Sequence, residues 1–352
     1  MITISLCMIV KNEEQCLRAC LESVKGVVDE YIIVDTGSTD GTKAIIRDYC
    51  DMDYHFTWIN DFSAARNYAF SLATKEYILW LDADDILLEK DRLALFKLKQ
   101  NLSPTIDIVS MIYDITFNEK GECILSIPRD KLIRNGAGFY WRYFVHEELV
   151  VQGTRYDSLI HITHTSDHGH YSRYIPNYEK RIADGYSLLP HEKYFFGGEL
   201  FMAKNYERCI TILTDFLDDS YDNSYEIKRA YEYIIACYEI QEQYSNALEY
   251  AFRYMKQYVP SINMCYTIAT LFYQMNQTDQ AIYWYQTIIE DSLHPIINQE
   301  AYSKKISSLI QLCVCHYKKG NLAESIKYND KVLELDSTNK SALYNQQFFQ
   351  NL

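Results

Sequence analysis

The sequence predicts two parts with different folds: an α/β domain with a Rossmann-like, mostly parallel sheet, and then an all-α domain of helical repeats. Three observations support this. Apolar runs alternate with helical patterns in the first half, eleven of the twelve glycines lie before residue 199, and a short pattern recurs in the second half. At 352 residues the chain is too long for one ordinary core. We expect two domains, 1–190 and 191–352.

Three continuous apolar runs predict strands that are buried on both faces of a parallel sheet. They occupy residues 4–10, 31–34 and 77–81. Helical patterns lie between these runs, at residues 14–24, 43–49 and 64–73. This alternation is typical of an α/β domain, in which ligands bind beyond the carboxyl ends of the strands.

The second half repeats a six-residue pattern with a small residue at its fifth position: NYERCI (205–210), QYSNAL (243–248), QTDQAI (277–282) and NLAESI (321–326). The small residues are Cys209, Ala247, Ala281 and Ser325, at spacings of 38, 34 and 44 residues. A period of about 34 residues with a small residue where two helices cross is typical of tetratricopeptide hairpins. The longest spacing predicts a longer loop around residues 291–298. An irregular helical bundle is the alternative.

The composition excludes several classes of protein. A net charge of −14 offers no basic footprint for nucleic acid. Ten cysteines are too sparse for a disulfide scaffold and do not form a zinc-ligand pattern. The apolar start lacks the features of a signal peptide, and no apolar run is long enough to span a membrane. We therefore expect a cytoplasmic protein with no membrane span and no nucleic-acid partner.

Polar residues follow the first two predicted strands directly. Asn12 and Glu13 follow the first strand, where capping of the next helix explains them as well as a ligand site does. Asp35 follows the second strand and can accept hydrogen bonds from a ribose or a base, while Gly37 lets the backbone approach a ligand closely. A turn followed by a helix cap at Asp40 is the alternative there.

Three aspartates follow the third predicted strand, in the segment Asp82-Ala83-Asp84-Asp85. Carboxylates this close repel one another, and a divalent cation such as Mg²⁺ or Mn²⁺ compensates that repulsion through the oxygen ligands it prefers. Alternation points Asp82 and Asp84 to the same side, which suits joint use of one ion. A solvated acidic turn is the alternative.

Four motifs in this order resemble glycosyltransferase family 2. They are MIVKNEE (8–14), VDTGSTD (34–40), DFSAARN (61–67) and LDAD (81–84). With the helical repeats, the set is similar to bacterial family members that carry a tetratricopeptide tail, a group that includes peptide glycosyltransferases acting on bacteriocins. The resemblance covers roughly residues 2–170 by sequence and the remainder by architecture. It implies a GT-A fold and inverting transfer of a sugar, glucose or a related hexose, from a UDP-sugar.

The resemblance also implies roles for single residues. Asp35 would hold the uridine, Arg66 would line the nucleotide site, and the pair of Asp82 and Asp84 would hold the metal on the diphosphate. The donor-binding set it implies is Val10, Asn12, Glu13, Asp35, Gly37, Arg66, Asp82 and Ala83.

Inversion requires a carboxylate that takes the proton of the acceptor. Glu147 and Glu148 lie in an apolar and aromatic segment, 141–149, and such surroundings raise the pKa of a carboxyl group towards useful values. We favour Glu147, with Glu148 as the alternative, because only one of two consecutive residues is expected to face the pocket. The preceding His146 completes the catalytic set.

Six of the nine histidines lie between residues 146 and 191. Members of the family commonly complete the metal site with a histidine near this point, and His164, in a segment that alternates like a strand, best matches that position. His168 and His170 are the alternatives. Any of them could instead order the local chain.

These observations predict a metal-dependent transferase that moves a hexose from a UDP-sugar to a Ser, Thr or Cys side chain of a peptide or protein. The repeat domain holds 19 of the 32 tyrosines and is expected to engage the acceptor. Transfer to a lipid-linked precursor or cell-surface glycan is one alternative, and a non-catalytic repeat scaffold is another. The oligomeric state, a homodimer included, stays open.

Overall fold

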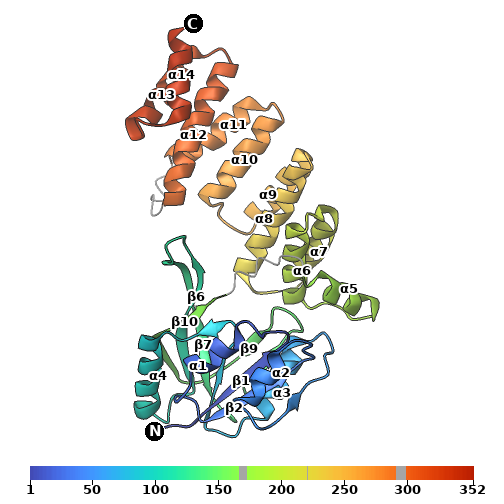
Figure 1. Cartoon of the computed structure of the whole chain (residues 1–352). Coiled ribbons are helices and arrows are strands. Elements are labelled where there is room, and N and C mark those ends of the chain that lie inside the picture. The colour runs from blue at the N-terminus through green and yellow to red at the C-terminus, as the bar shows by residue number, and fades with distance from the viewer. Residues whose placement is uncertain (166–172, 220, 291–298) are drawn as a thin grey trace. The chain divides into compact units, whose positions relative to one another are not determined.

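The computed structural model describes residues 1–165, 173–219, 221–290 and 299–352 (Figure 1). The chain divides into two compact units. The first comprises Met1–His170 with Glu179–Arg181, and the second comprises Tyr171–Tyr178 with Ile182–Leu352. An α/β unit is followed by a helical unit, which confirms the predicted fold class. The boundary at residue 190 stays a prediction.

An eight-stranded mixed sheet, with strand order β3-β2-β1-β4-β7-β6-β10-β5, forms the centre of the first unit. The strands are β1 (Ile4–Val10), β2 (Glu30–Asp35), β3 (Tyr54–His55), β4 (Tyr77–Trp80), β5 (Asp85–Ile86), β6 (Ile108–Phe117), β7 (Cys123–Arg134) and β10 (Arg155–His164). Strands β1 to β4 pair in parallel, whereas β7 is antiparallel to both β4 and β6. The predicted strands correspond to β1, β2 and β4. A separate small sheet pairs β8 (Tyr140–Arg142) with β9 (Glu148–Val150).

Helices cover both faces of the large sheet, as the continuous apolar strands require. They are α1 (Leu17–Ser23), α2 (Thr42–Arg47), α3 (Phe62–Ser71) and α4 (Glu89–Asn101). Leu6 and Met8 of β1 share one core with residues of α1, α2 and α4. Cys7, between them, points to the opposite face and packs against Ala69 of α3. The carboxyl ends of β1, β2 and β4 are therefore held between two helical layers.

The second unit is helical throughout the residues that the structure describes. Its helices are α6 (Pro190–Met202), α7 (Tyr206–Asp218), α8 (Ser224–Ile240), α9 (Tyr244–Met255), α10 (Ile262–Gln274), α11 (Thr278–Glu290), α12 (Gln299–Lys318), α13 (Leu322–Leu335) and α14 (Lys340–Gln350). The residues of α5 (Ile175–Ala183) are divided between the two units. Helices α6 to α13 form four successive hairpins, coloured from green to red in Figure 1. The longer loop predicted at residues 291–298 lies outside the described residues.

The four hairpins share one turn. Each turn holds a residue with left-handed backbone, with φ of 61°, 58°, 60° and 79° in chain order. These residues are Lys204, Glu242, Asn276 and Gly320. The next residue in each case donates its N–H to the carbonyl five positions back, at 2.8–2.9 Å, which caps the first helix of the hairpin. The turn therefore repeats with the spacing that the sequence predicted.

The predicted small residues lie at equivalent places in the four hairpins. Each is the fourth residue of the second helix and is fully buried; they are Cys209, Ala247, Ala281 and Ser325. Each second helix also packs on the first helix of the next hairpin, in the pairs α7–α8, α9–α10 and α11–α12. This serial packing confirms the tetratricopeptide-like arrangement.

All ten cysteines are free thiols, and most are buried. None of the described helices is long and apolar enough to cross a lipid bilayer.

Candidate active site

The loops that follow β1 and β2 are joined at their bases. Thr36 donates its backbone N–H and its hydroxyl to the carbonyl of Val10, at 2.9 and 3.1 Å. Asn12 has left-handed backbone, with φ of 58°. Its N–H donates to Ser38 Oγ at 2.9 Å, and its Oδ1 accepts from the N–H of Thr39 at 2.8 Å. Asn12 therefore ties the two strand-end loops together.

Capping of the following helix does not explain Asn12 and Glu13. Cys16 is the N-cap of α1, four residues after Asn12. Glu13 instead donates its N–H to Thr42 Oγ1, at 2.7 Å, at the start of α2. The segment after β1 is thus built against the segment after β2, and both lie at the edge where an α/β sheet binds ligands.

Asp35 is buried at the end of β2. Its carboxylate accepts hydrogen bonds from the backbone N–H groups of Gly37 and Ser38, at 3.0–3.2 Å, and lies 3.5 Å from Lys43 Nζ. Burial alone would raise the pKa of Asp35, but the side chain and backbone of Ser38, followed by the N–H of Gly37 and the charge of Lys43, outweigh burial and hold the pKa below its ordinary value. The end of β2 therefore carries a fixed negative charge.

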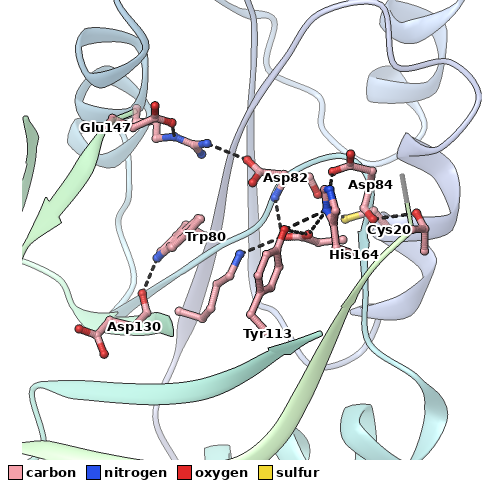
Figure 2. A network of polar contacts seen from close by, with 12 residues as sticks. Cys20, Trp80, Asp82, Asp84, Tyr113, Asp130, Glu147 and His164 are labelled. Atoms are coloured by element: carbon pink, nitrogen blue, oxygen red, sulfur yellow. Dashed lines mark hydrogen bonds and ion pairs between the residues drawn. The ribbon is translucent and has the colours of Figure 1, made fainter. Parts of the chain in front are cut away.

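Arg66 of α3 joins two carboxylates, those of Glu147 and Asp82, which are labelled in Figure 2. Its Nε donates to Glu147 Oε1 and its Nη2 donates to Asp82 Oδ1, both at 2.8 Å. The guanidinium also lies over the rings of Trp80 and Trp141. Burial lowers the pKa of Arg66, but the charges of Asp82 and Glu147 outweigh burial and raise it. The guanidinium is thus a permanent cation between the end of β4 and the loop before β9.

Asp84, Asp85 and His164 form a cluster of potential metal ligands. One ligand atom from each lies within 4.8 Å of the other two. Carboxylate oxygens and imidazole nitrogen suit a divalent cation such as Mn²⁺. These donors fit the metal that the resemblance implies.

Asp85 is the most enclosed member of this cluster, with no exposed surface. It accepts from Lys131 Nζ at 2.8 Å, and Lys131 is itself 1% exposed. Tyr113 Oη also donates to Asp85, at 2.8 Å. Burial would raise the pKa of Asp85, but Lys131 and His164 hold it well below the ordinary value. Sequence reasoning missed Lys131 and Tyr113, because both lie on strands that it did not identify.

Two further pKa shifts follow from the same contacts. The hydrogen bond with Asp85 raises the pKa of His164. Burial, followed by the charges of Asp85 and Asp82, raises the pKa of Tyr113. The Tyr113 hydroxyl therefore stays protonated and can donate a hydrogen bond across the ordinary pH range.

The two glutamates considered as the base lie in different surroundings. Glu147 has 15% of its side chain exposed and is held by Arg66. Glu148 belongs to β9, is 49% exposed and pairs with Arg142 across the small sheet. His146 precedes them with a φ of 51°. Of the two glutamates, Glu147 is therefore the one that Arg66 joins to Asp82 at the end of β4.

The loop that carries Glu147 is fixed to α3. The side-chain amide of Asn67 exchanges two hydrogen bonds with the backbone of Trp141, both at 2.8 Å. The N–H of Phe62 donates to the carbonyl of Phe144 at 2.9 Å. Since α3 also carries Arg66, one helix positions both the arginine and the loop of the glutamate that it binds.

The structure brings the expected residues together in two groups. The first lies at the ends of β1 and β2 and comprises Val10, Asn12, Glu13, Asp35 and Gly37. The second comprises Arg66, Asp82, Asp84, Glu147 and His164, of which Figure 2 labels Asp82, Asp84, Glu147 and His164. Ala83 lies between Asp82 and Asp84 in the chain, and its side chain is buried in the core of the first unit. Within it the carboxylate of Asp82 contacts Arg66, whereas Asp84 lies against His164. His168 and His170 lie outside the described residues.

A domain at the start of the chain belongs to a known family. Residues 5–136 match the family model described as "Glycosyl transferase family 2". The first unit therefore contains a family 2 glycosyltransferase domain, which confirms the family expected from the four motifs. The matched residues include Asp35, Arg66 and Asp84, and they end before Glu147 and His164.

Several curated proteins are similar to parts of this chain. A TPR repeat-containing protein of Synechococcus elongatus is 51% identical over 88 residues, which cover 25% of this chain and 22% of that protein. Glycosyltransferase SunS of Bacillus subtilis is 40% identical over 92 residues, 26% of this chain and 22% of SunS. The lipopolysaccharide core biosynthesis glycosyltransferase LpsC of Rhizobium meliloti is 29% identical over 172 residues, 45% of this chain and 62% of LpsC.

Among solved structures, MamA of Desulfovibrio magneticus aligns with 48% of this chain and 85% of its own length, at 16% identity and a TM-score of 0.37. The chain matches about a fifth of the length of the first two curated relatives.

Proposed function

We propose that this protein is a metal-dependent, inverting glycosyltransferase that moves a hexose from a UDP-sugar to a peptide or protein side chain. The observation that carries the proposal is the chain of contacts from Glu147 through Arg66 to Asp82, beside Asp84 and His164. Of these residues, Arg66, Asp82 and Asp84 lie in the segment that matches the family 2 model. It combines a candidate base, a fixed cation and candidate metal ligands at the carboxyl edge of the sheet.

In this proposal the donor lies across the two groups of residues. Asp35 and the loop of Asn12 hold the uridine, since they form the rigid pair of strand-end loops. Asp84 and His164, with Asp82, would hold the divalent cation. When bound, that cation would neutralise the charge that develops on the departing diphosphate.

Glu147 is the proposed base. Arg66 occupies Oε1 of Glu147, which leaves Oε2 to accept a proton from the acceptor. The acceptor oxygen or sulfur then forms a bond to the anomeric carbon, while the bond from that carbon to the diphosphate breaks and UDP leaves with the electron pair. Glu148, paired with Arg142 on the small sheet, takes no part in this step.

The second unit is proposed to bind the acceptor. Helices α8, α10 and α12, the first helices of the second, third and fourth hairpins, line a hollow of about 280 Å³. Its lining includes the buried side chains of Ile235 and Met264, together with three glutamates and one lysine, namely Glu232, Glu239, Glu300 and Lys304. Burial raises the pKa of Glu239. A hollow of this size and mixed polarity suits one or two side chains of an extended peptide.

A glycan acceptor is the second candidate, and the similarity to LpsC favours it, since that relative is named for lipopolysaccharide core biosynthesis. Purified protein with a UDP-hexose, Mn²⁺ and either a peptide library or a lipid-linked oligosaccharide separates the two acceptors. A mass increase of one hexose on the peptide supports the first candidate, and on the glycan the second.

Release of UDP from UDP-glucose and related UDP-hexoses, with Mn²⁺ or Mg²⁺, tests the transferase itself. Glu147→Gln should lower the rate by about 10²- to 10⁴-fold, the usual contribution of a general base. Glu148→Gln is the matched control and should stay within about twofold of wild type, since surface ion pairs contribute little. If wild type neither releases UDP nor binds it, a non-catalytic scaffold replaces the proposal.

A further inference from the structure

The hydrogen bonds around Asp85 assign it a task different from that of its neighbour Asp84. A carboxylate offers about four lone-pair positions. Oδ2 of Asp85 accepts from Lys131 Nζ at 2.8 Å and from the N–H of Asp82 at 3.0 Å. Oδ1 accepts from Tyr113 Oη at 2.8 Å and contacts His164 Nδ1 at 3.3 Å. All four positions are therefore occupied by groups of this chain.

The same bonds decide which nitrogen of His164 carries a proton. The Tyr113 hydroxyl has one hydrogen, and it is donated to Asp85. Tyr113 Oη lies 2.9 Å from His164 Nδ1, so the hydroxyl oxygen accepts a hydrogen bond from Nδ1–H. The neutral imidazole then has its lone pair on Nε2, which is the form in which a histidine binds a metal through Nε2.

Lys131 keeps Asp85 in this arrangement. Its ammonium group lies 3.7 Å from the centre of the Trp80 ring and 4.4 Å from that of Tyr113. The ammonium therefore contacts two aromatic rings while it donates to Asp85. A buried ammonium between two rings and a carboxylate has little freedom to move. Figure 2 shows the hydroxyl of Tyr113 directed toward the ring of His164.

We propose that Asp85, held by Lys131 and Tyr113, is a positioning residue that orients His164 for metal binding through Nε2 and is not itself a metal ligand. Carboxylates that hold metal-binding histidines in this way usually contribute about 10- to 100-fold to metal affinity. The inference rests on the proposed metal-dependent function.

The first test is the tautomer of His164 in the metal-free full chain. Long-range ¹H–¹⁵N NMR of histidine-labelled protein distinguishes Nδ1–H from Nε2–H, and His164→Gln identifies the signal. Because the pKa of His164 is raised, the spectra are recorded at increasing pH, above the ordinary histidine pKa of about 6.5, until the His164 signal no longer changes. The Nδ1–H form is expected. An Nε2–H form would overturn the inference.

The second test is the affinity for Mn²⁺ alone, measured by calorimetric titration. Tyr113→Phe removes one bond of the network and should weaken Mn²⁺ binding by about tenfold, the low end of the usual range. Tyr77→Phe is the matched control, because Tyr77 is also buried in the same sheet and donates its hydroxyl to the carbonyl of Ile106. Equal affinities in these two variants would overturn the role of Tyr113.

The double variant Asp85→Asn with Lys131→Met removes both charges of the pair together, so that neither is left buried alone. It should bind Mn²⁺ about 10- to 100-fold more weakly than wild type, whereas Asp84→Asn should lose detectable binding. If the double variant loses binding as completely as Asp84→Asn, Asp85 is a ligand and the inference fails. If wild type itself binds no Mn²⁺, the metal-dependent function fails and this role fails with it.

Discussion

Substitution of Arg66 by lysine tests whether one side chain couples the proposed base to the donor site. The guanidinium reaches Glu147 with Nε and Asp82 with Nη2, at 2.8 Å each. A lysine keeps the positive charge, but its ammonium is a compact point charge without this forked geometry. We therefore expect Arg66→Lys to keep one of the two contacts and to lose the other.

The size of the effect follows from the lost contact. A hydrogen bond to a charged group contributes about 1.5–3 kcal/mol. At 1.36 kcal/mol for each factor of ten, this corresponds to a loss of about 10- to 150-fold in kcat/KM. Loss of the Glu147 contact would lower kcat, and loss of the Asp82 contact would raise KM for the UDP-sugar.

Steady-state kinetics with varied UDP-sugar at saturating Mn²⁺ measure both constants. Arg134→Lys is the matched control, because Arg134 Nε binds Asp107 Oδ1 at the same distance of 2.8 Å, away from the cluster. It should change kcat/KM by less than about twofold, or 0.4 kcal/mol. A kcat/KM for Arg66→Lys as close to wild type as that of the control would refute the coupling role of Arg66.

Two further predictions concern the stability of the first unit. Lys131→Met leaves Asp85 charged and buried without its cation, which should lower the free energy of unfolding by about 3–5 kcal/mol. Calorimetry of the full chain should then show the Tm of this unit lowered by roughly 6–20 °C. A decrease in the free energy of unfolding of less than about 1 kcal/mol would contradict the pairing of Lys131 with Asp85. The second is a pH dependence: since the folded pKa of Asp35 is lowered, its stabilising effect is present above the ordinary carboxyl pKa of about 4 and is lost as the pH falls through the lowered pKa. Asp35→Asn should therefore flatten the acid limb of the curve of unfolding free energy against pH, and an unchanged limb would contradict this account.

The parts of the fold that the sequence predicted are those with a local signature. Strands β1, β2 and β4 are buried on both faces, so their apolar runs are continuous. The hairpins of the second unit repeat a turn with a left-handed residue and a buried small residue, and both recur in the sequence. Strand β7 was missed because most of its first half is exposed and its buried end begins with Lys131.

The sequence predicted those residues of the site that follow the ends of apolar strands. Asp35 and Asp84 follow apolar strands directly, so their place at the carboxyl edge follows from the fold class. The different surroundings of Glu147 and Glu148 could not be predicted from the sequence, because they depend on the pairing of Glu148 with Arg142 in the small sheet. The ion-pair partner of Asp85 could not be predicted either, since Lys131 lies 46 residues away in the sequence.

The central claim is that Asp84 and His164 belong to a metal site on which donor binding depends. Calorimetric titration of the full chain with UDP, in Mn²⁺ and then in excess chelator, tests this directly. We expect UDP to bind wild type in Mn²⁺, and binding to be lost with chelator or in Asp84→Asn. Asp48→Asn, which alters an exposed carboxylate paired with Arg18, should bind UDP as wild type does. Binding of UDP that is equally tight in wild type and Asp84→Asn, with or without Mn²⁺, would contradict the account.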